Sequence, residues 1–353
     1  MSSRADRLAA AVAERGLDAL LVTNPANLRW ATGFTGSNGA CLIGPELRVF
    51  FTDFRYVEQA AVQVDAGFER VRAARELLGG IAERLAGRVG FEDAFLSVRS
   101  HARLREAAAD AELVGASGTI EPLREVKDPH ELETMRAAAR IADQVYEELA
   151  ERGIDGRTEK QVAVDFELRL RELGADDRSF PPIVASGAQG ALPHAVPRDV
   201  PVERDTLMIV DAGCVVDGYC SDCTRTFAIG SPSDEARAVY ELVADAQLAA
   251  LAAVKAGAEC AAADSAAREP IERAGHGEHF GHPLGHGVGL EVHEGPRLAQ
   301  TADGALRTGN TVTVEPGVYV PGAFGVRIED LVCVTDAGCE ILTGFRKDLV
   351  TLP

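Results

Sequence analysis

The sequence has no long hydrophobic run and is short of basic residues. No apolar stretch among its 353 residues is long enough to span a bilayer. Its 36 Lys and Arg residues are outnumbered by 55 Asp and Glu residues, which gives a formal net charge of −19. Because nucleic acids and anionic membranes repel such a charge, we expect neither as a partner.

We also expect neither a secretory signal nor a cysteine framework. Its N-terminus reads as an amphipathic helix followed by a strand, without the uninterrupted apolar core of a signal peptide. The 7 cysteines are an odd number, and the CxxC pair at Cys220 and Cys223 has no second pair to complete a zinc site. We therefore expect free thiols in a reducing cytoplasm, with Cys214, Cys220 and Cys223 acting as small hydrophobes.

The first part of the chain alternates helical and strand-like segments, which is typical of an α/β layer domain. The spacing of Gly33, Gly36 and Gly39 does not match the dinucleotide-binding fingerprint, so we expect no nucleotide site there. This domain therefore looks architectural. Strands are expected at Leu17–Thr23, Ala40–Ile43, Leu47–Thr52 and Arg88–Phe91, and helices near Phe54–Val64, Ala74–Leu85 and His101–Ala109.

A boundary near residue 125 divides the chain into an expected domain at 1–124 and another at 125–353. Just after it, Asp128 and Glu131 supply the N-cap and the capping-box partner of a long helix that ends at Gly153.

Further helices are expected from Thr158, across Asp234–Lys255 and over 261–273. Pro270 should kink or end the last of them. Strands lie between these helices, so we expect an α+β domain with helices packed on a largely antiparallel sheet built from hairpins.

Two segments of the second domain repeat one pattern. Each has a strand, an acid followed two residues later by glycine, a turn, and a returning strand that carries another acid. The acids are Asp211 and Asp222 in the first segment, and Glu315 and Glu329 in the second. The similarity indicates two related half-domains that each deliver two carboxylates from a hairpin. Asp330, beside Glu329, should face the opposite side of its strand.

The stretch Gly281–Pro296 is rich in glycine and contains His282, His286 and His293. We expect a bend around His286, because glycine lets the backbone approach a ligand closely. The alternating apolar residues of Val288–Val292 predict a short strand that leads to His293.

Burying an acid in an apolar strand is costly unless the acid is paired or bound to a cation. A single such acid is explained by an ion pair or a strand-end hydrogen bond, but four acids with a histidine call for a common explanation. Two divalent ions roughly 3.5–4 Å apart supply one. Oxygen ligands with one imidazole favour Mn²⁺, Co²⁺ or Fe²⁺ over a thiolate-type zinc site.

These motifs resemble those of the pita-bread metallopeptidases, the family of aminopeptidase P, prolidase, methionine aminopeptidase and creatinase. Asn24–Trp30 and Thr32–Gly36 resemble the creatinase-type N-terminal domain of aminopeptidase P and prolidase. The resemblance implies an α/β creatinase-like domain at 1–124 and an α+β pita-bread catalytic domain at 125–353. The catalytic motifs are VDAG, CSDCTRTF, GHGVGLEVHE, VEPG and VRIED, which contain Asp211, Asp222, His286, Glu315 and Glu329 in that order.

The resemblance implies that all five of these residues are metal ligands. Asp211 should hold one ion, His286 and Glu315 the other, and Asp222 and Glu329 should bridge the two. We expect two divalent ions, with Mn²⁺ first and Co²⁺, Fe²⁺ or Zn²⁺ as alternatives.

The same resemblance implies roles in catalysis and substrate binding. Glu315 should be the general base, His194 should steady the scissile amide, and His293 should hydrogen-bond the substrate carbonyl. Four further residues complete this set: His282 lines the pocket, Tyr319 and Arg327 support the bridging carboxylate and a proton relay, and Arg297 matches an arginine that can bind the free carboxylate of a dipeptide.

These features predict an enzyme that hydrolyses the bond between an N-terminal residue and proline. We take an Xaa-Pro aminopeptidase as the first interpretation and a prolidase, which acts only on dipeptides, as the alternative. A non-catalytic peptide-binding module is a third, which the intact ligand set disfavours. We expect a cytoplasmic homodimer whose substrate is a proline-containing peptide.

Overall fold

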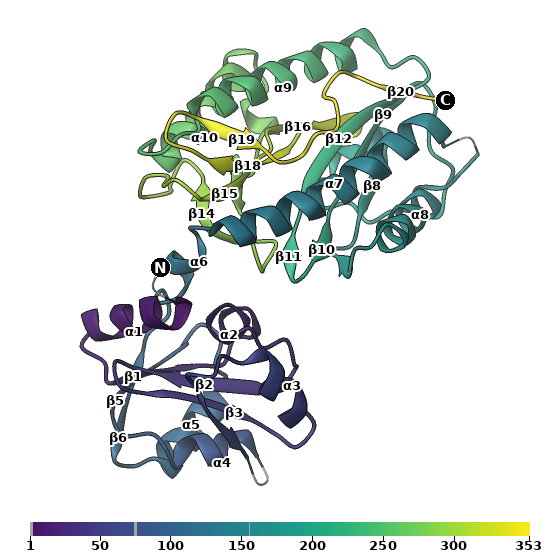
Figure 1. Ribbon diagram of the computed structural model, residues 1–353. Coiled ribbons are helices and arrows are strands. Elements are labelled where there is room, and N and C mark those ends of the chain that lie inside the picture. Colours follow the sequence, from purple (N-terminus) through teal and green to yellow (C-terminus); the bar gives the residue numbers. More distant parts are fainter. Residues whose placement is uncertain (1–2, 74–75, 155) are drawn as a thin grey trace. The chain divides into compact units, whose positions relative to one another are not determined.

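The computed structural model describes residues 3–73, 76–154 and 156–353. The chain divides into two compact units, Met1–Arg124 and Glu125–Pro353, which are described in turn (Figure 1). The helix expected at Ala74–Leu85 begins on two positions, Ala74 and Arg75, that lie outside the described residues.

The first unit is built on a six-stranded sheet in the order β4-β3-β2-β1-β5-β6. The pairs β1–β2 and β2–β3 are antiparallel, whereas β3–β4, β1–β5 and β5–β6 are parallel. The edge strands β4 and β6 were not expected. The residues of β4 are mostly exposed and charged, and those of β6 are only partly buried or exposed. The strands are β1 (Ala19–Val22), β2 (Gly39–Ile43), β3 (Arg48–Thr52), β4 (Glu69–Arg72), β5 (Gly87–Phe91) and β6 (Ala111–Gly115).

Helices pack on this sheet around a core that includes Leu21, Leu42, Phe51 and Ile81. The alternation of helix and strand therefore confirms the expected α/β class of this unit. The helices are α1 (Arg4–Glu14), α2 (Pro25–Thr32), α3 (Val57–Gln63), α4 (Leu77–Ala82), α5 (Val98–Ala107) and α6 (Glu121–Arg124).

The second unit contains small, mostly antiparallel sheets. Its longest pair is β9 with β12, β15 pairs with β18, and β20 runs parallel to β12. The strands are β7 (Asp177–Arg178), β8 (Ile183–Ser186), β9 (Thr206–Ala212), β10 (Cys214–Val216), β11 (Tyr219–Cys220), β12 (Cys223–Ile229), β13 (Gly285–Gly287), β14 (Glu294–Leu298), β15 (Thr311–Val314), β16 (Gly317–Val320), β17 (Phe324–Arg327), β18 (Asp330–Val334), β19 (Cys339–Ile341) and β20 (Thr351–Leu352).

The expected repetition of hairpins is present in the order and pairing of these strands. In the first repeat β9 pairs with β12, and the shorter β10 and β11 pair between them. In the second repeat β15 pairs with β18, and β16 and β17 pair between them. Each repeat is thus an outer pair of strands whose connection is itself a hairpin.

Helices cover these strands, as Figure 1 shows for α7 and α9. α7 packs on β10, β11 and β20, α8 on β8, and α10 on β14. No helix in the described part of the chain has the length and apolar character needed to cross a membrane. The helices are α7 (Pro129–Arg152), α8 (Glu159–Glu172), α9 (Asp234–Ala253) and α10 (Cys260–Arg273), with the 3-10 turns η1 (Gly187–Ala191) and η2 (Gly277–His279).

The ends of two helices follow the capping rules. Asp128 and Glu131 form the capping box of α7, which ends at Gly153, and Thr158 caps α8. Pro270 does not end α10, which continues to Arg273. A proline removes one backbone hydrogen-bond donor from a helix. The last turn of α10 forms nevertheless, and Ile271 in that turn packs into the core of this unit. All seven cysteines are free, as expected.

Candidate metal centre and active site

The two hairpins bring four carboxylates to the ends of their outer strands, which are β9 and β12 in the first and β15 and β18 in the second. Asp211 lies in β9 opposite Thr224, and Glu315 follows β15 directly. Asp222 and Glu329 were expected within the returning strands, and that detail is wrong. Each lies immediately before a strand, at a break in the hairpin. At one break the Glu329 N–H donates to the Thr224 carbonyl at 3.1 Å, which joins the two hairpins.

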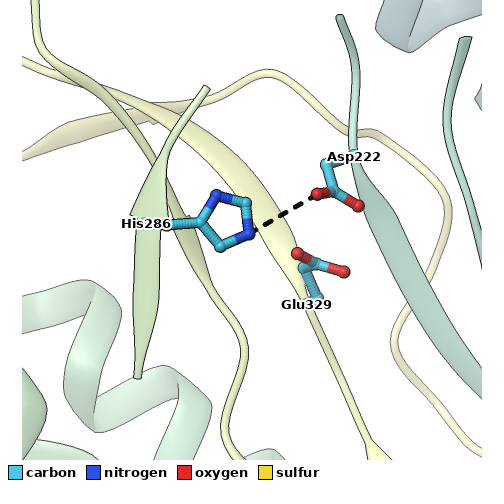
Figure 2. Close-up of side chains that lie close together, drawn as sticks. All are labelled: Asp222, His286 and Glu329. Carbon is cyan, nitrogen blue, oxygen red and sulfur yellow. Dashed lines mark ion pairs between the residues drawn. The ribbon is translucent and has the colours of Figure 1, made fainter. Parts of the chain in front are cut away.

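Asp222, Glu329 and His286 form one cluster, and their side chains point toward one another (Figure 2). One ligand atom from each residue lies within 4.8 Å of the others. Nε2 of His286 is 3.7 Å from Oδ2 of Asp222, and Nδ1 is 3.0 Å from the Gly287 carbonyl oxygen. When Nδ1 carries the proton and donates to that carbonyl, Nε2 presents its lone pair to the carboxylates.

Glu315 and Asp211 extend this cluster. Oε1 of Glu315 lies 3.3 Å from Nε2 of His286 and accepts a hydrogen bond from the Thr313 hydroxyl at 3.1 Å. Oδ2 of Asp211 accepts from Nη2 of Arg327 at 2.7 Å. The buried Oδ1 of Asp211 has no hydrogen-bond partner within the described residues. Such orphaned oxygens are rare, because they lose their hydration without compensation.

The charges of these carboxylates conflict with their burial. Burial raises the pKa of Asp222 and of Glu329 well above the usual range, and neighbouring carboxylates add to the shift. Burial also raises the pKa of Asp211, although Arg327 opposes the change. Burial acts in the same direction on Glu315, but the hydrogen bond and charge of His286 help to outweigh it and lower its pKa to about 2.

A divalent cation fits this arrangement. It would neutralise the crowded carboxylates and would give Oδ1 of Asp211 a partner. Four carboxylates with one imidazole are a donor set suited to Mn²⁺, Co²⁺ or Fe²⁺. No cysteine belongs to the cluster of candidate ligands among the described residues. Cys214, Cys220 and Cys223 are buried, and burial raises the pKa of each thiol.

The strand expected over Val288–Val292 is wrong. These residues belong to the loop that connects β13 to the antiparallel β14, and His286 lies in β13 itself. The apolar alternation arises because the loop packs on the core beneath α7. The loop returns His293 to His286, and their ring centroids are 4.4 Å apart in an edge-to-face arrangement.

A row of hydrogen bonds runs from His282 to Asp211. Nε2 of His282 lies 2.9 Å from the hydroxyl of Tyr319 in β16. That hydroxyl accepts from Nη1 of Arg327 at 2.7 Å, and Nη2 of Arg327 continues to Asp211. Burial raises the pKa of Tyr319 to about 12, so its hydroxyl stays protonated at neutral pH.

The hydroxyl of Thr224 links Arg327 to Glu329. Nε of Arg327 donates to the Thr224 hydroxyl at 3.0 Å, and that hydroxyl donates to Oε2 of Glu329 at 2.6 Å. We had not expected Thr224 or Thr313 in the site. Each stands two residues from an acid, Asp222 or Glu315. Period-two geometry places such a pair on one side of a strand, and this signal could have identified both threonines.

The remaining expected site residues lie nearer to solvent. His194 is exposed in the loop after η1, and the carbonyl of its neighbour Pro193 lies 3.4 Å from Nη1 of Arg327. His293 is exposed; the burial of part of its ring, followed by the charge of His286, lowers its pKa. Arg297 is exposed on β14.

Asp330 faces away from this cluster, as expected. Its carboxylate accepts hydrogen bonds from Arg225 at 2.8 Å, Lys347 at 2.6 Å and Gln247 at 2.8 Å. Neighbouring residues thus serve two sides of the strand: Glu329 belongs to the acid cluster and Asp330 to a buried ion-pair network behind it.

Both units match known protein families. Residues 4–126 match the Creatinase/Prolidase N-terminal domain, and residues 133–336 match metallopeptidase family M24. The Xaa-Pro dipeptidase of Pyrococcus furiosus is 34% identical over 99% of this chain and 100% of its own length.

Solved structures agree with these matches. The Xaa-Pro dipeptidase from Bacillus anthracis is 41% identical, with a TM-score of 0.95 over 99% of both chains. The X-Pro aminopeptidase from Thermotoga maritima is 37% identical, with a TM-score of 0.89 over 96% of this chain and 99% of its own. These likenesses confirm the expected fold class. The chain belongs to metallopeptidase family M24 and combines a creatinase-type N-terminal domain with a pita-bread catalytic domain.

Proposed function

We propose that this metallopeptidase is an Xaa-Pro dipeptidase, which hydrolyses dipeptides that end in proline. The observation that carries the proposal is the cluster of four carboxylates with His286, in a chain that is 41% identical to a structure described as an Xaa-Pro dipeptidase. The sequence had put the Xaa-Pro aminopeptidase first. The named relatives favour the alternative, and the 37% identical X-Pro aminopeptidase supports the longer-peptide activity as a second candidate.

We assign two divalent ions to the five candidate ligands. Asp211 would hold one ion, His286 and Glu315 the other, and Asp222 and Glu329 would contact both. We propose Mn²⁺ first, because the oxygen-rich donor set suits it, with Co²⁺, Fe²⁺ or Zn²⁺ as alternatives. Bound ions of this kind polarise the scissile carbonyl and lower the pKa of the attacking water.

Glu315 is assigned as the general base. A carboxylate that binds a metal ion is ionised, so Glu315 can accept a proton from the attacking water. Thr313 and His286 hold this carboxylate in place through contacts of 3.1 and 3.3 Å.

We assign substrate-binding roles to three histidines. His293, beside His286, would donate a hydrogen bond to the substrate carbonyl oxygen as negative charge develops there. The lowered pKa of His293 keeps its ring neutral, with one N–H available. His194 would steady the scissile amide, and His282 with Tyr319 would form the wall of the pocket. Arg297 would bind the free carboxylate of a dipeptide through two parallel hydrogen bonds.

A peptide panel tests the proposal. The protein is treated with chelator, reloaded with Mn²⁺ or Co²⁺, and given Xaa-Pro, Xaa-Pro-Yaa and longer peptides, with Xaa-Ala peptides as the control. Cleavage confined to Xaa-Pro dipeptides supports the dipeptidase. Comparable kcat/KM for longer peptides supports the aminopeptidase instead. If no divalent ion produces hydrolysis, the catalytic assignment is wrong and a peptide-binding module remains.

We also propose that the protein is a cytoplasmic homodimer. Light scattering on the purified protein tests the assembly, and the expected mass is twice that of one chain. The mass of a single chain at all concentrations would contradict the dimer. Fractionation of cells that produce the protein tests its location.

A further inference from the structure

The segment Phe280–Leu284 carries His282 into the site, yet within the described residues it belongs to no helix or strand. It connects η2 to β13. The Leu284 carbonyl accepts a hydrogen bond from the backbone N–H of Glu315 at 2.8 Å. The position of this irregular segment therefore affects both a substrate-facing histidine and the residue assigned as the general base.

Two side chains of α10 hold this segment. Arg268 donates from Nη1 to the Phe280 carbonyl at 2.7 Å and from Nη2 to the His282 carbonyl at 2.8 Å. Oδ1 of Asp264 accepts from the Leu284 N–H at 2.9 Å. The backbone is thus fixed at three points, before, at and after His282.

Arg268 and Asp264 also bind each other. Nε and Nη2 of Arg268 donate to the two carboxylate oxygens of Asp264 at 2.6 and 2.9 Å. The side chains are 9% and 0% exposed, and the guanidinium lies 4.1 Å from the centroid of the Phe280 ring. The attraction within a buried ion pair often does no more than offset its desolvation cost. Net stability is therefore a weak explanation for this pair, whereas a planar, two-pronged arrangement is well suited to fixing geometry.

We propose that Arg268 and Asp264 are positioning residues for the peptidase reaction. They hold the backbone of Phe280–Leu284, and through it they keep His282 in contact with Tyr319. The inference rests on the proposed function, because it gives His282 a part in the substrate site. A catalytic group displaced by about 1 Å can cost about 10²-fold in rate.

Arg268→Lys tests this inference. Lysine keeps the positive charge but cannot donate in one plane to a carboxylate and two carbonyls. We expect kcat for an Xaa-Pro substrate to fall by about 10- to 100-fold, while KM and the Mn²⁺ content per chain stay near their wild-type values. Arg273→Lys is a matched control on the same helix, because Arg273 forms an exposed i,i+4 pair with Glu269. Its kcat should equal that of the wild type.

A double-mutant cycle separates positioning from a general structural effect. His282→Asn removes the side chain through which Arg268 is proposed to act. In that background, Arg268→Lys should lower kcat by less than about twofold further, since residues that act as a unit are not additive. An equal fold-loss in both backgrounds would show that Arg268 does not act through His282, and would overturn the proposal.

Asp264→Asn is a second variant that keeps an acceptor for the Leu284 N–H and weakens the pair with Arg268. A loss of kcat in the same direction supports the proposal. If Arg268→Lys and Asp264→Asn both keep the wild-type kcat, the proposal is contradicted. It is also contradicted if both variants lose cooperative folding. Wild-type protein in the same assay separates the two ideas. If it cleaves no Xaa-Pro peptide, the proposed function fails and the positioning role fails with it; if it does and the variants match it, only the positioning role fails.

Discussion

Arg327 holds Asp211 by a buried hydrogen bond of 2.7 Å between Nη2 and Oδ2. The two side chains are 4% and 12% exposed. The other donors of the guanidinium engage Tyr319 and Thr224. One oxygen of Asp211 is therefore fixed by the protein, and the other, Oδ1, is left without a protein partner among the described residues. Arg327 thus orients the carboxylate as well as balancing its charge.

Arg327→Lys should weaken metal binding. An ammonium cannot donate to Asp211, Tyr319 and Thr224 in the fixed geometry of a guanidinium. We expect Mn²⁺ affinity, measured by isothermal titration calorimetry, to fall by about 10- to 100-fold. Arg346→Lys, at an exposed position, is the control. Unchanged affinity in Arg327→Lys would show that Asp211 does not need this orientation.

Glu315→Gln should abolish turnover and keep the fold. The amide fills the same volume but cannot accept a proton, so we expect kcat to fall by about 10²- to 10⁴-fold. Circular dichroism and thermal unfolding report on the fold. Glu340→Gln, which alters an exposed pair with Arg136, should leave kcat unchanged. Turnover near the wild-type rate in Glu315→Gln would remove Glu315 as the base.

In the metal-free protein, Asp222 and Glu329 should contribute less stability as the pH rises. Burial and mutual repulsion raise the pKa of Asp222 and of Glu329 well above the usual range in the folded chain. A group with a raised folded pKa stabilises the fold while it is protonated. That contribution is complete below the unfolded pKa of about 4 and is lost as the pH rises through the folded pKa. Thermal unfolding in chelator as a function of pH, with Asp222→Asn as the reference, measures this contribution, and an equal pH dependence in the two proteins would contradict it.

Adding Mn²⁺ should release protons and restore the lost stability. Carboxylate ligands bind metal in their deprotonated form, so a metal-free site with raised pKa values must give up protons on loading. A titration in weakly buffered solution detects the protons. Asp222→Asn should release fewer, because one titrating ligand is gone. Mn²⁺ binding without proton release would show that the free carboxylates are already ionised.

Arg225→Met should destabilise the second unit strongly. The pair of Arg225 and Asp330 is buried, with side chains 2% and 0% exposed, and the variant leaves the Asp330 carboxylate with fewer donors. Breaking one partner of such a pair costs about 3–5 kcal/mol in the free energy of unfolding. Urea denaturation measures the loss. Arg140→Met alters an exposed pair with Glu133 and should cost less than about 1 kcal/mol.

Features set by local rules could be predicted from the sequence. The capping box of Asp128 and Glu131 placed the start of α7, and Gly153 placed its end. The repeated order of strand, acid, glycine, turn and returning strand marked both hairpins correctly, and the chain reverses between β10 and β11 and between β16 and β17.

Features set by contacts between distant segments could not be predicted. Val288–Val292 alternates like a strand, but the alternation comes from a loop packed on the core. Arg327 was expected to support a bridging carboxylate, yet its direct partner is Asp211, more than a hundred residues away in the sequence. Nothing local in α10 shows that Arg268 holds the backbone around His282.

The hydrogen bond between the Glu329 N–H and the Thr224 carbonyl has a consequence for folding as well as for chemistry. This hydrogen bond lies where the two hairpins meet. Neither hairpin alone supplies all of the candidate metal ligands. A cation shared by Asp222 and Glu329 would cross-link positions roughly a hundred residues apart and close a long loop of the unfolded chain. Loading such an ion stabilises the folded state in proportion to the logarithm of its concentration. Resistance to proteases should therefore depend on how much metal is available.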